Sequence, residues 1–157
     1  MPFARLRQSE QGAAAVEFAV VAPLLVLFIF AIIDFGRFLS VHNRVTSAVR
    51  EGGRAAAASV VSTPTNTTDM DNRAVAKVRQ YMRDVQGDDQ VTAAEVVVTH
   101  PNLTNPANPN YGLIFVSLND NGTGGYRYTP ITPFANQIGI GNITLRPTAV
   151  FRWEKAD

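Results

Sequence analysis

Residues 11–18 read QGAAAVEF, and residues 19–33 continue as AVVAPLLVLFIFAII. The 21 residues from Ala13 to Ile33 contain only one charged side chain, Glu17. An α-helix rises about 1.5 Å per residue, so this run would extend about 32 Å, close to the thickness of the hydrocarbon core of a bilayer. The stretch therefore predicts a membrane-spanning helix.

The residues on either side of this run indicate its orientation. Arg5 and Arg7 precede it, and Asp34 is the first residue after it. Positive charge before a first span keeps the N-terminus in the cytoplasm. A secretory signal peptide is the competing interpretation, but its apolar region is shorter and ends at a small-residue cleavage site. The sequence DFGR at 34–37 is not such a site, and Pro23 is tolerated within a membrane helix.

Glu17 is the unexpected residue of the run. A carboxylate in hydrocarbon costs about 2–3 kcal/mol on insertion scales, and a plain anchor has no need of it. Snorkelling toward the interface would keep the plain anchor open as an interpretation. Cleavage after Gly12 would instead make Ala13 the new N-terminus. In a stack of parallel helices, Glu17 could then reach the Ala13 ammonium of a neighbour and fix the register of the stack.

The residues Gly12 to Phe18, GAAAVEF, resemble the prepilin peptidase site of type IV pilins. Over residues 9–58 the chain is similar to TadE-like pseudopilins of the tight-adherence (Tad) pilus system. The features that carry this resemblance are VEF at 16–18, Pro23, DFGR at 34–37 and AVREGGR at 48–54.

The resemblance implies a minor pilin that a prepilin peptidase cleaves after Gly12. Gly12 and Ala13 would flank the scissile bond, and Glu17, followed by Phe18, would be the register carboxylate. Glycine suits the site because it resists helix and offers the peptidase an unwound backbone.

The resemblance also implies a division of the chain and a location. Residues 1–12 would be a cytoplasmic leader, 13–33 the transmembrane half of a long helix, and 34–157 an extracytoplasmic pilin-like domain. We expect a single-pass protein of the bacterial inner membrane that can enter a surface pilus. Its expected partners are the peptidase, other Tad pilins and pseudopilins, and the inner-membrane assembly platform.

Helical periodicity continues beyond the apolar run, so we predict one helix from about Ala13 to Ala58. Its second half is amphipathic, with an apolar stripe of Phe35, Phe38, Leu39, Val41, Val45, Ala48 and Val49. The pair Gly52-Gly53 weakens the helix by about 1 kcal/mol per glycine. It marks either a bend or a point where another chain approaches closely.

A second helix is predicted from Asp71 to about Gln86, after a polar loop at 59–70, with Asp69 or Asp71 as its cap. Its apolar stripe comprises Ala74, Val75, Val78, Tyr81, Met82 and Val85. The opposite face carries Arg73, Lys77, Arg79 and Arg83. This basic face could bind lipid headgroups or an acidic partner, but a solvated face is the favoured interpretation.

The remaining sequence predicts three strands, at Val91–Thr99, Leu113–Leu118 and Asn142–Trp153. Pro147 indicates that the last strand bends or begins at an edge. Residues 126–142 are interpreted as a loop with a short helical turn. The predicted fold is α+β: an antiparallel sheet of three or four strands packs on the outer half of the long helix, and the second helix closes the core.

Composition excludes several kinds of chemistry. The chain has no cysteine, which excludes disulfides and thiolate metal sites, and its net charge of +1 gives no reason to expect nucleic-acid binding. His42 and His100 have no spaced ligand partner and are interpreted as structural or surface residues. Residues 119–124 resemble a calcium loop, but Pro130 replaces the acidic twelfth ligand, so a turn is favoured. The loop aromatics Tyr111, Tyr126, Tyr128 and Phe134 form at most a contact surface.

The leading hypothesis is a minor pilin that catalyses nothing and needs no cofactor or metal. A permanently anchored extracytoplasmic binding module is the alternative, and the processed terminus distinguishes the two. A membrane-bound hydrolase is disfavoured, because the sequence does not bring together a nucleophile, a base and an orienting residue.

Overall fold

A computed structural model of the 157-residue chain describes residues 3–59, 67–86, 91–92, 95–119, 125–132, 135, 139 and 141–153, and it describes no side chains for residues 3–11 and 86. The chain divides into two compact units, Met1–Arg37 and Phe38–Asp157. The first unit is helical. The second is an α+β domain, as the sequence predicts.

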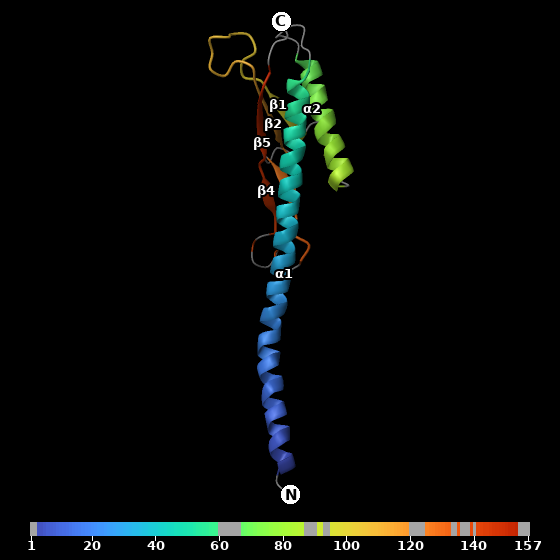
Figure 1. Cartoon of the computed structure of the whole chain (residues 1–157), viewed down its shortest axis with the longest axis vertical. Coiled ribbons are helices and arrows are strands. Elements are labelled where there is room, and N and C mark those ends of the chain that lie inside the picture. Colours follow the sequence, from blue (N-terminus) through green and yellow to red (C-terminus); the bar gives the residue numbers. More distant parts are fainter. Residues whose placement is uncertain are drawn as a thin grey trace. The chain divides into compact units, whose positions relative to one another are not determined.

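The longest element is α1, a 55-residue helix from Phe3 to Ala57 (Figure 1). Its end lies within one residue of the predicted end. Its predicted start at Ala13 is wrong, because the helix already begins at Phe3 and passes through Gly12. The residues before Gly12 are mostly good helix formers, and one glycine costs only about 1 kcal/mol, which is too little to end the helix.

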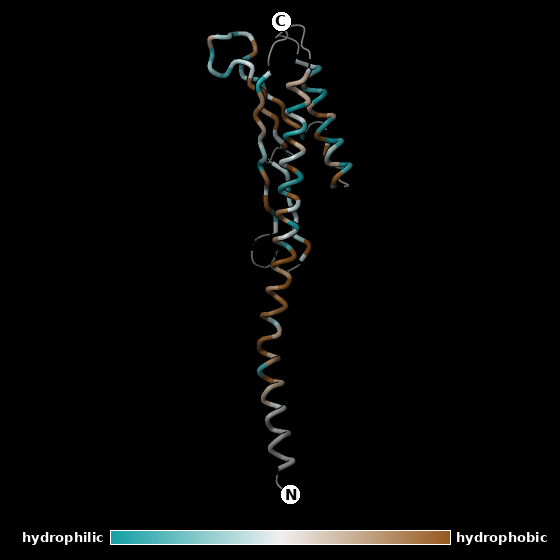
Figure 2. The backbone as a smooth tube through the Cα atoms, in the orientation of Figure 1, coloured by the Kyte–Doolittle hydropathy of each residue, from teal (hydrophilic) through white to brown (hydrophobic). Residues whose placement is uncertain are grey.

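Between Ala13 and Ile33, α1 is apolar on every side, with Glu17 as its one charged residue. Its exposed large hydrophobic side chains follow one another almost without a gap: Val16, Phe18, Val20, Val21, Leu24, Leu25, Val26, Phe28, Ile29, Phe30, Ile32 and Ile33. Figure 2 shows the hydrophobic colours that dominate this part of the helix. Among the described residues, α1 is the one helix long and apolar enough to cross a membrane. A helix that is hydrophobic all round is typical of a membrane span.

From Phe38 onward, α1 buries only one stripe. Val41, Val45, Ala48, Val49 and Ala56 are buried in the hydrophobic core of the second unit. Their spacing of three, four and seven residues keeps them on one helical face. The predicted stripe is confirmed at Phe38, which packs against the core, and from Val41 onward, whereas Phe35 and Leu39 are exposed.

The pair Gly52-Gly53 allows two other elements to approach α1 closely. A Cβ atom on Gly52 would overlap Val78 Cγ2 and lie 3.1 Å from the carbonyl oxygen of Ala74, while a Cβ on Gly53 would overlap the ring of Phe151. The helix is continuous through both glycines. The sequence predicted a bend or the close approach of another chain; the structure instead shows a close approach by α2 and by Phe151 of the same chain.

The second helix, α2, runs from Thr68 to Tyr81 and continues as a π-helix, η1, from Met82 to Gln86. The predicted cap is wrong: Thr67 occupies the N-cap position, and Asp69 and Asp71 lie in the first turn. Carboxylates in the first turn of a helix interact favourably with its dipole. The two aspartates therefore do mark the start of α2, but they lie inside its first turn rather than at the cap.

One side of α2 faces the core of the second unit. Met70, Ala74, Val78 and Met82 are fully buried, and Val75 and Tyr81 pack against them. Val85, the last member of the predicted stripe, is 44% exposed. The wider turn of η1 rotates Val85 away from the direction that an α-helix would give it.

Three strands form an antiparallel sheet in the order β1-β2-β5: β1 at Val96–Thr99, β2 at Leu113–Leu118 and β5 at Thr148–Arg152. Val116 pairs with Val98 on one side and with Ala149 on the other. Ile114, Val116 and Leu118 are buried, as the alternation in this stretch predicts. The bounds of β2 agree with the sequence, whereas the first strand is shorter than predicted.

The last predicted strand is divided in two. Ile143–Leu145 (β4) pairs with Tyr126–Tyr128 (β3) in a separate two-stranded ribbon, and β5 begins after Pro147. Proline has no N–H to donate to a ladder, which explains the break. The interpretation of residues 126–142 as loop is therefore wrong for β3, since three residues are too few for alternation to stand out.

The glycine contact with the sheet can be tested by replacing Gly53 with alanine. Because the new Cβ would overlap the Phe151 ring, we expect Gly53→Ala to lower the free energy of unfolding by about 1–3 kcal/mol, the usual cost of overpacking. Thermal unfolding followed by circular dichroism in detergent measures this. Gly36→Ala in the same helix is the matched control, because nothing lies within 4 Å of a Cβ there. Equal melting temperatures for the two variants would contradict the packing role.

Candidate functional site

The predicted processing site lies within the first unit, on α1. Gly12 and Ala13 are helical and exposed, and a Cβ built on Gly12 meets no atom within 4 Å. Gly12 therefore differs from Gly52 and Gly53, where neighbouring atoms leave no space. Nothing in the described part of the chain requires a glycine at position 12 for packing.

The helical backbone at Gly12 differs from the unwound backbone that the sequence suggested. A peptide bond inside a helix has its N–H and C=O groups engaged in hydrogen bonds, so a peptidase would first have to open the helix locally. Glycine is about 1 kcal/mol less favourable than alanine in a helix. Opening is therefore cheaper at Gly12 than at the alanines 13–15 that follow it.

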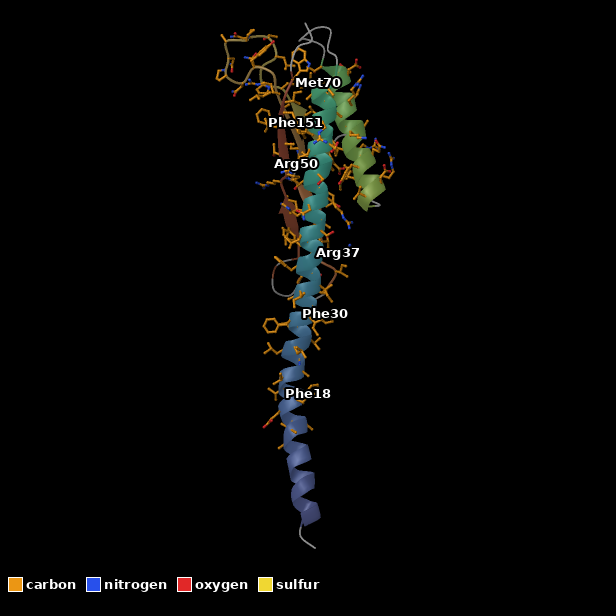
Figure 3. The ribbon with its side chains drawn as sticks, viewed as in Figure 1. Phe18, Phe30, Arg37, Arg50, Met70 and Phe151 are labelled. Atoms are coloured by element: carbon orange, nitrogen blue, oxygen red, sulfur yellow. The ribbon has the colours of Figure 1, made fainter. Side chains whose placement is uncertain are left out.

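Glu17 and Phe18 lie one helical turn beyond the predicted cleavage point, and both are exposed. Phe18 is 68% exposed, and Figure 3 shows its ring projecting from α1. Glu17 has no hydrogen bond or ion pair with any residue that the structure describes. The structure thus presents Glu17 as an ionisable group without a partner within its own described chain, among side chains suited to lipid.

The two histidines lie apart and do not form a site with each other. His100 Nε2 lies 2.7 Å from Asp71 Oδ1, and Asp71 Oδ2 accepts a hydrogen bond of 3.3 Å from Thr67 Oγ1. This contact ties the end of β1 to the first turn of α2, which is a structural role. His42 is exposed, and its ring centroid lies 6.2 Å from that of Phe38. Among the described residues, no three His, Asp or Glu side chains are grouped to hold a metal.

The basic side chains of α2 are exposed, in agreement with a solvated face. Lys77 Nζ donates to Gln80 Oε1 at 3.2 Å, and Arg79 Nε donates to the carbonyl oxygen of Val91 at 3.1 Å. Arg79 therefore has a structural contact in addition to its charge. The predicted turn at 120–124 and Phe134 lie outside the described residues.

Sequence reasoning missed an aromatic contact at the start of the second unit. Tyr126 and Tyr128 were expected in a loop contact surface, but they lie on β3, where Tyr128 is buried and Tyr126 packs against the core. The ring of Tyr128 meets that of Phe38 edge-on, with 5.5 Å between centroids and 75° between planes. The alternation Tyr-Arg-Tyr, with exposed Arg127 in the middle, was the signal available in the sequence.

The described residues thus combine one helix that is long and apolar enough to cross a membrane with a small α+β domain. Residues 12–54 match the family model described as TadE-like protein, which confirms the predicted resemblance over those residues. No curated protein and no solved structure matches the chain.

The His100–Asp71 contact can be tested by a double-mutant cycle. We expect Asp71→Ala and His100→Ala to show a coupling energy of about 0.5–1 kcal/mol, because each removes the other's partner at a partly buried site. Chemical unfolding of the four proteins measures the coupling. Asp69→Ala combined with His100→Ala is the control, since Asp69 lies in the same turn and is exposed. Additive effects in both cycles would show that the contact contributes nothing.

Proposed function

We propose that the protein is a minor pilin or pseudopilin of a Tad-type pilus, processed after Gly12 and assembled through its apolar helix. The observation that carries the proposal is the unpartnered Glu17 at a fixed distance from Gly12 within the TadE-like segment. On this proposal the protein catalyses no reaction. Its second unit is extracytoplasmic, and it acts by packing into a polymer or by priming one.

The register that Glu17 would impose follows from helix geometry. Glu17 lies four positions after Ala13, which corresponds to an axial rise of about 6 Å. A neighbouring parallel helix displaced by about 6 Å along the axis would therefore bring its Ala13 ammonium level with Glu17. The ammonium exists only after cleavage, so processing and pairing are linked in this proposal. The pair would neutralise two charges that are each costly in an apolar environment.

A permanently anchored binding module is the second candidate. The observation that favours it is that α1 continues through Gly12 without a break, so the uncleaved chain forms a regular helix. In that case Glu17 would snorkel toward the interface, and the second unit would bind its ligand or envelope partner while tethered. Prepilin peptidase and an assembly platform would not be partners.

Processing can be tested by the mass and N-terminal sequence of the protein from membranes of cells with active prepilin peptidase. We expect a chain of 145 residues that begins at Ala13, since removal of 12 from 157 leaves 145. Gly12→Val should leave the chain uncleaved, because a branched side chain would replace glycine at the scissile bond. Gly36→Ala is the matched control and should be cleaved normally. An intact leader in the wild-type protein would overturn the proposed cleavage.

The register role is tested separately with Glu17→Gln, which keeps the shape of the side chain and removes its charge. We expect the variant to reach the membrane in normal amounts and to be cleaved normally, but to be incorporated into filaments at least tenfold less. A tenfold loss corresponds to a contact that contributes about 1.4 kcal/mol. Immunoblots of sheared pili against total protein measure incorporation. Val16→Ala changes the neighbouring exposed side chain and should incorporate normally. Wild-type incorporation of Glu17→Gln would rule out a charge-based register.

A further inference from the structure

The three-stranded sheet of the second unit ends at β5. Its strand order is β1-β2-β5, so β5 pairs with β2 on one side and forms the edge of the sheet on the other (Figure 1). Just after β5, the N–H of Trp153 donates to the carbonyl oxygen of Gly112 at 2.7 Å, which continues the β2–β5 pairing. Backbone groups alternate in direction along an antiparallel strand, so Ala149 and Phe151 also bond to β2. The residues whose N–H and C=O groups point away from β2 are Thr148, Val150 and Arg152.

The outer edge of β5 is open. Its three outward-pointing residues are all exposed, and Val150 is 51% exposed. Within the described ranges, no strand pairs with this edge, and no turn or loop forms a backbone hydrogen bond with it. A proline could block such an edge, but Pro147 precedes β5 and does not lie within it. An exposed row of unpaired N–H and C=O groups is a template for pairing with another strand.

The opposite edge of the sheet, at β1, is engaged by neighbouring parts of the chain. His100 follows β1 directly and contacts Asp71 of α2. Glu95 precedes β1, and its carboxylate accepts the N–H of Thr92. Val96, the first residue of β1, is buried. Of the two edges that the structure describes for this sheet, β5 is therefore the one available to another molecule.

The side chains of the three outward-pointing residues lie on one face of the sheet, because side chains alternate between faces along a strand. The other face of β5 is turned to the interior, where Ala149 is buried and the ring of Phe151 lies against Gly53. The outer face of β5 thus presents one aliphatic side chain, Val150, and one cation, Arg152. Arg152 forms no ion pair within the described part of the chain.

We propose that the β5 edge is a docking site for an extended segment of another polypeptide, which adds to the sheet as an antiparallel strand and places an acidic side chain opposite Arg152. Main-chain hydrogen bonds to the three outward-pointing residues would supply affinity, and the side chains opposite them would supply specificity. Directly opposite residues of antiparallel strands lie about 5.5 Å apart between Cα atoms, close enough for a charge pair. The residue two positions after the acidic one would lie opposite Val150 and would be aliphatic.

A different polypeptide fits this edge better than a second copy of the chain. If two β5 edges paired antiparallel, the residue opposite Arg152 would be Thr148, Val150 or the other Arg152, depending on the register. None of these is acidic, so the guanidinium would gain no partner, and two facing arginines would repel each other. The β1 edge of a second copy is already engaged, as is the carboxylate of Glu95. The inference concerns the second unit alone and is independent of cleavage after Gly12.

Amide hydrogen exchange of the full-length protein in detergent micelles, resolved by NMR, tests whether the edge is open. We expect the amides of Val150 and Arg152 to exchange at least about tenfold faster than those of Ala149 and Phe151, because only the latter two bond to β2. Slow exchange at all four positions in dilute protein would show that the edge is covered and would overturn the proposal. Slow exchange at Val150 and Arg152 that appears only as protein concentration rises would assign the edge to a second copy, which also overturns it.

The partner chemistry is tested with the capped synthetic peptide Ser-Glu-Thr-Val-Thr-Thr-Ser, which can place its Glu opposite Arg152 and its Val opposite Val150. We expect this peptide to slow exchange at Val150 and Arg152 in a saturable manner. A peptide with Lys in place of Glu should bind about threefold more weakly or worse. A peptide with Pro in place of Val should have no effect, because proline has no N–H to donate to Val150. No saturable effect of the first peptide, or equal binding of the Glu and Lys peptides, would overturn the proposal.

Two arginine variants locate the charge contact. Arg152→Gln should bind the Glu and Lys peptides equally, whereas Arg127→Gln, which changes an exposed arginine of β3 in the separate ribbon, should keep the preference for Glu. Unchanged exchange at Ala149 and Phe151 would verify that both variants are folded. A preference for Glu that survives Arg152→Gln would contradict the assigned contact. The uncleaved Gly12→Val variant should bind the peptides as the wild-type chain does, which separates this inference from the proposed function.

Discussion

A single helix in this protein has to satisfy two different environments. Over residues 13–33, α1 exposes apolar side chains on every side, and from Val41 to Ala56 it buries one stripe against a small domain. Both are compatible with one uninterrupted helix, because the backbone hydrogen bonds are formed within the segment and do not depend on the surroundings. Only the pattern of side chains changes along α1. Its amphipathic part, from Val41 to Ala56, offers one apolar stripe, and the strands and α2 of the second unit pack along that stripe.

The glycines of α1 show how differently one residue type is used along the helix. Gly52 and Gly53 leave room for Val78 and Phe151, whereas Gly12 and Gly36 have open surroundings. The TadE-like match runs from residue 12 to residue 54 and thus ends one residue after the close-packed pair. Within the matched segment, the structure gives Gly52 and Gly53 a packing role in the chain itself. The structure gives Gly12 no packing role among the described residues. A requirement for glycine at this position would therefore have to come from contact with another molecule.

The sequence predicted the elements whose signals are long or strongly periodic. The apolar run, the end of α1 and the bounds of Leu113–Leu118 agree with the structure because many residues contribute to each signal. Sequence-based prediction was wrong where a small local free energy or a contact in the tertiary structure decides the outcome. One glycine could not stop α1 at residue 12, a π-helical turn displaced Val85, and Tyr126–Tyr128 is too short to show alternation. The candidate site was predicted from the position of Glu17 in the apolar run and from the resemblance, and the partner expected for Glu17 would lie on a second molecule.

The energetics of the apolar run indicate why one carboxylate would matter so much in the proposed assembly. Lipid tails are as apolar as leucine side chains, so moving residues such as Leu24 or Ile29 from a bilayer into a bundle of similar helices gains little from the hydrophobic effect. Packing of these side chains is adaptable and fixes axial position weakly. Glu17 is different, because its free energy changes sharply between lipid and a position beside an ammonium group. On the proposed function, Glu17 is the residue of the apolar run that is least favourable in the bilayer. Its free energy is therefore what distinguishes the assembled filament from the free protein in the membrane.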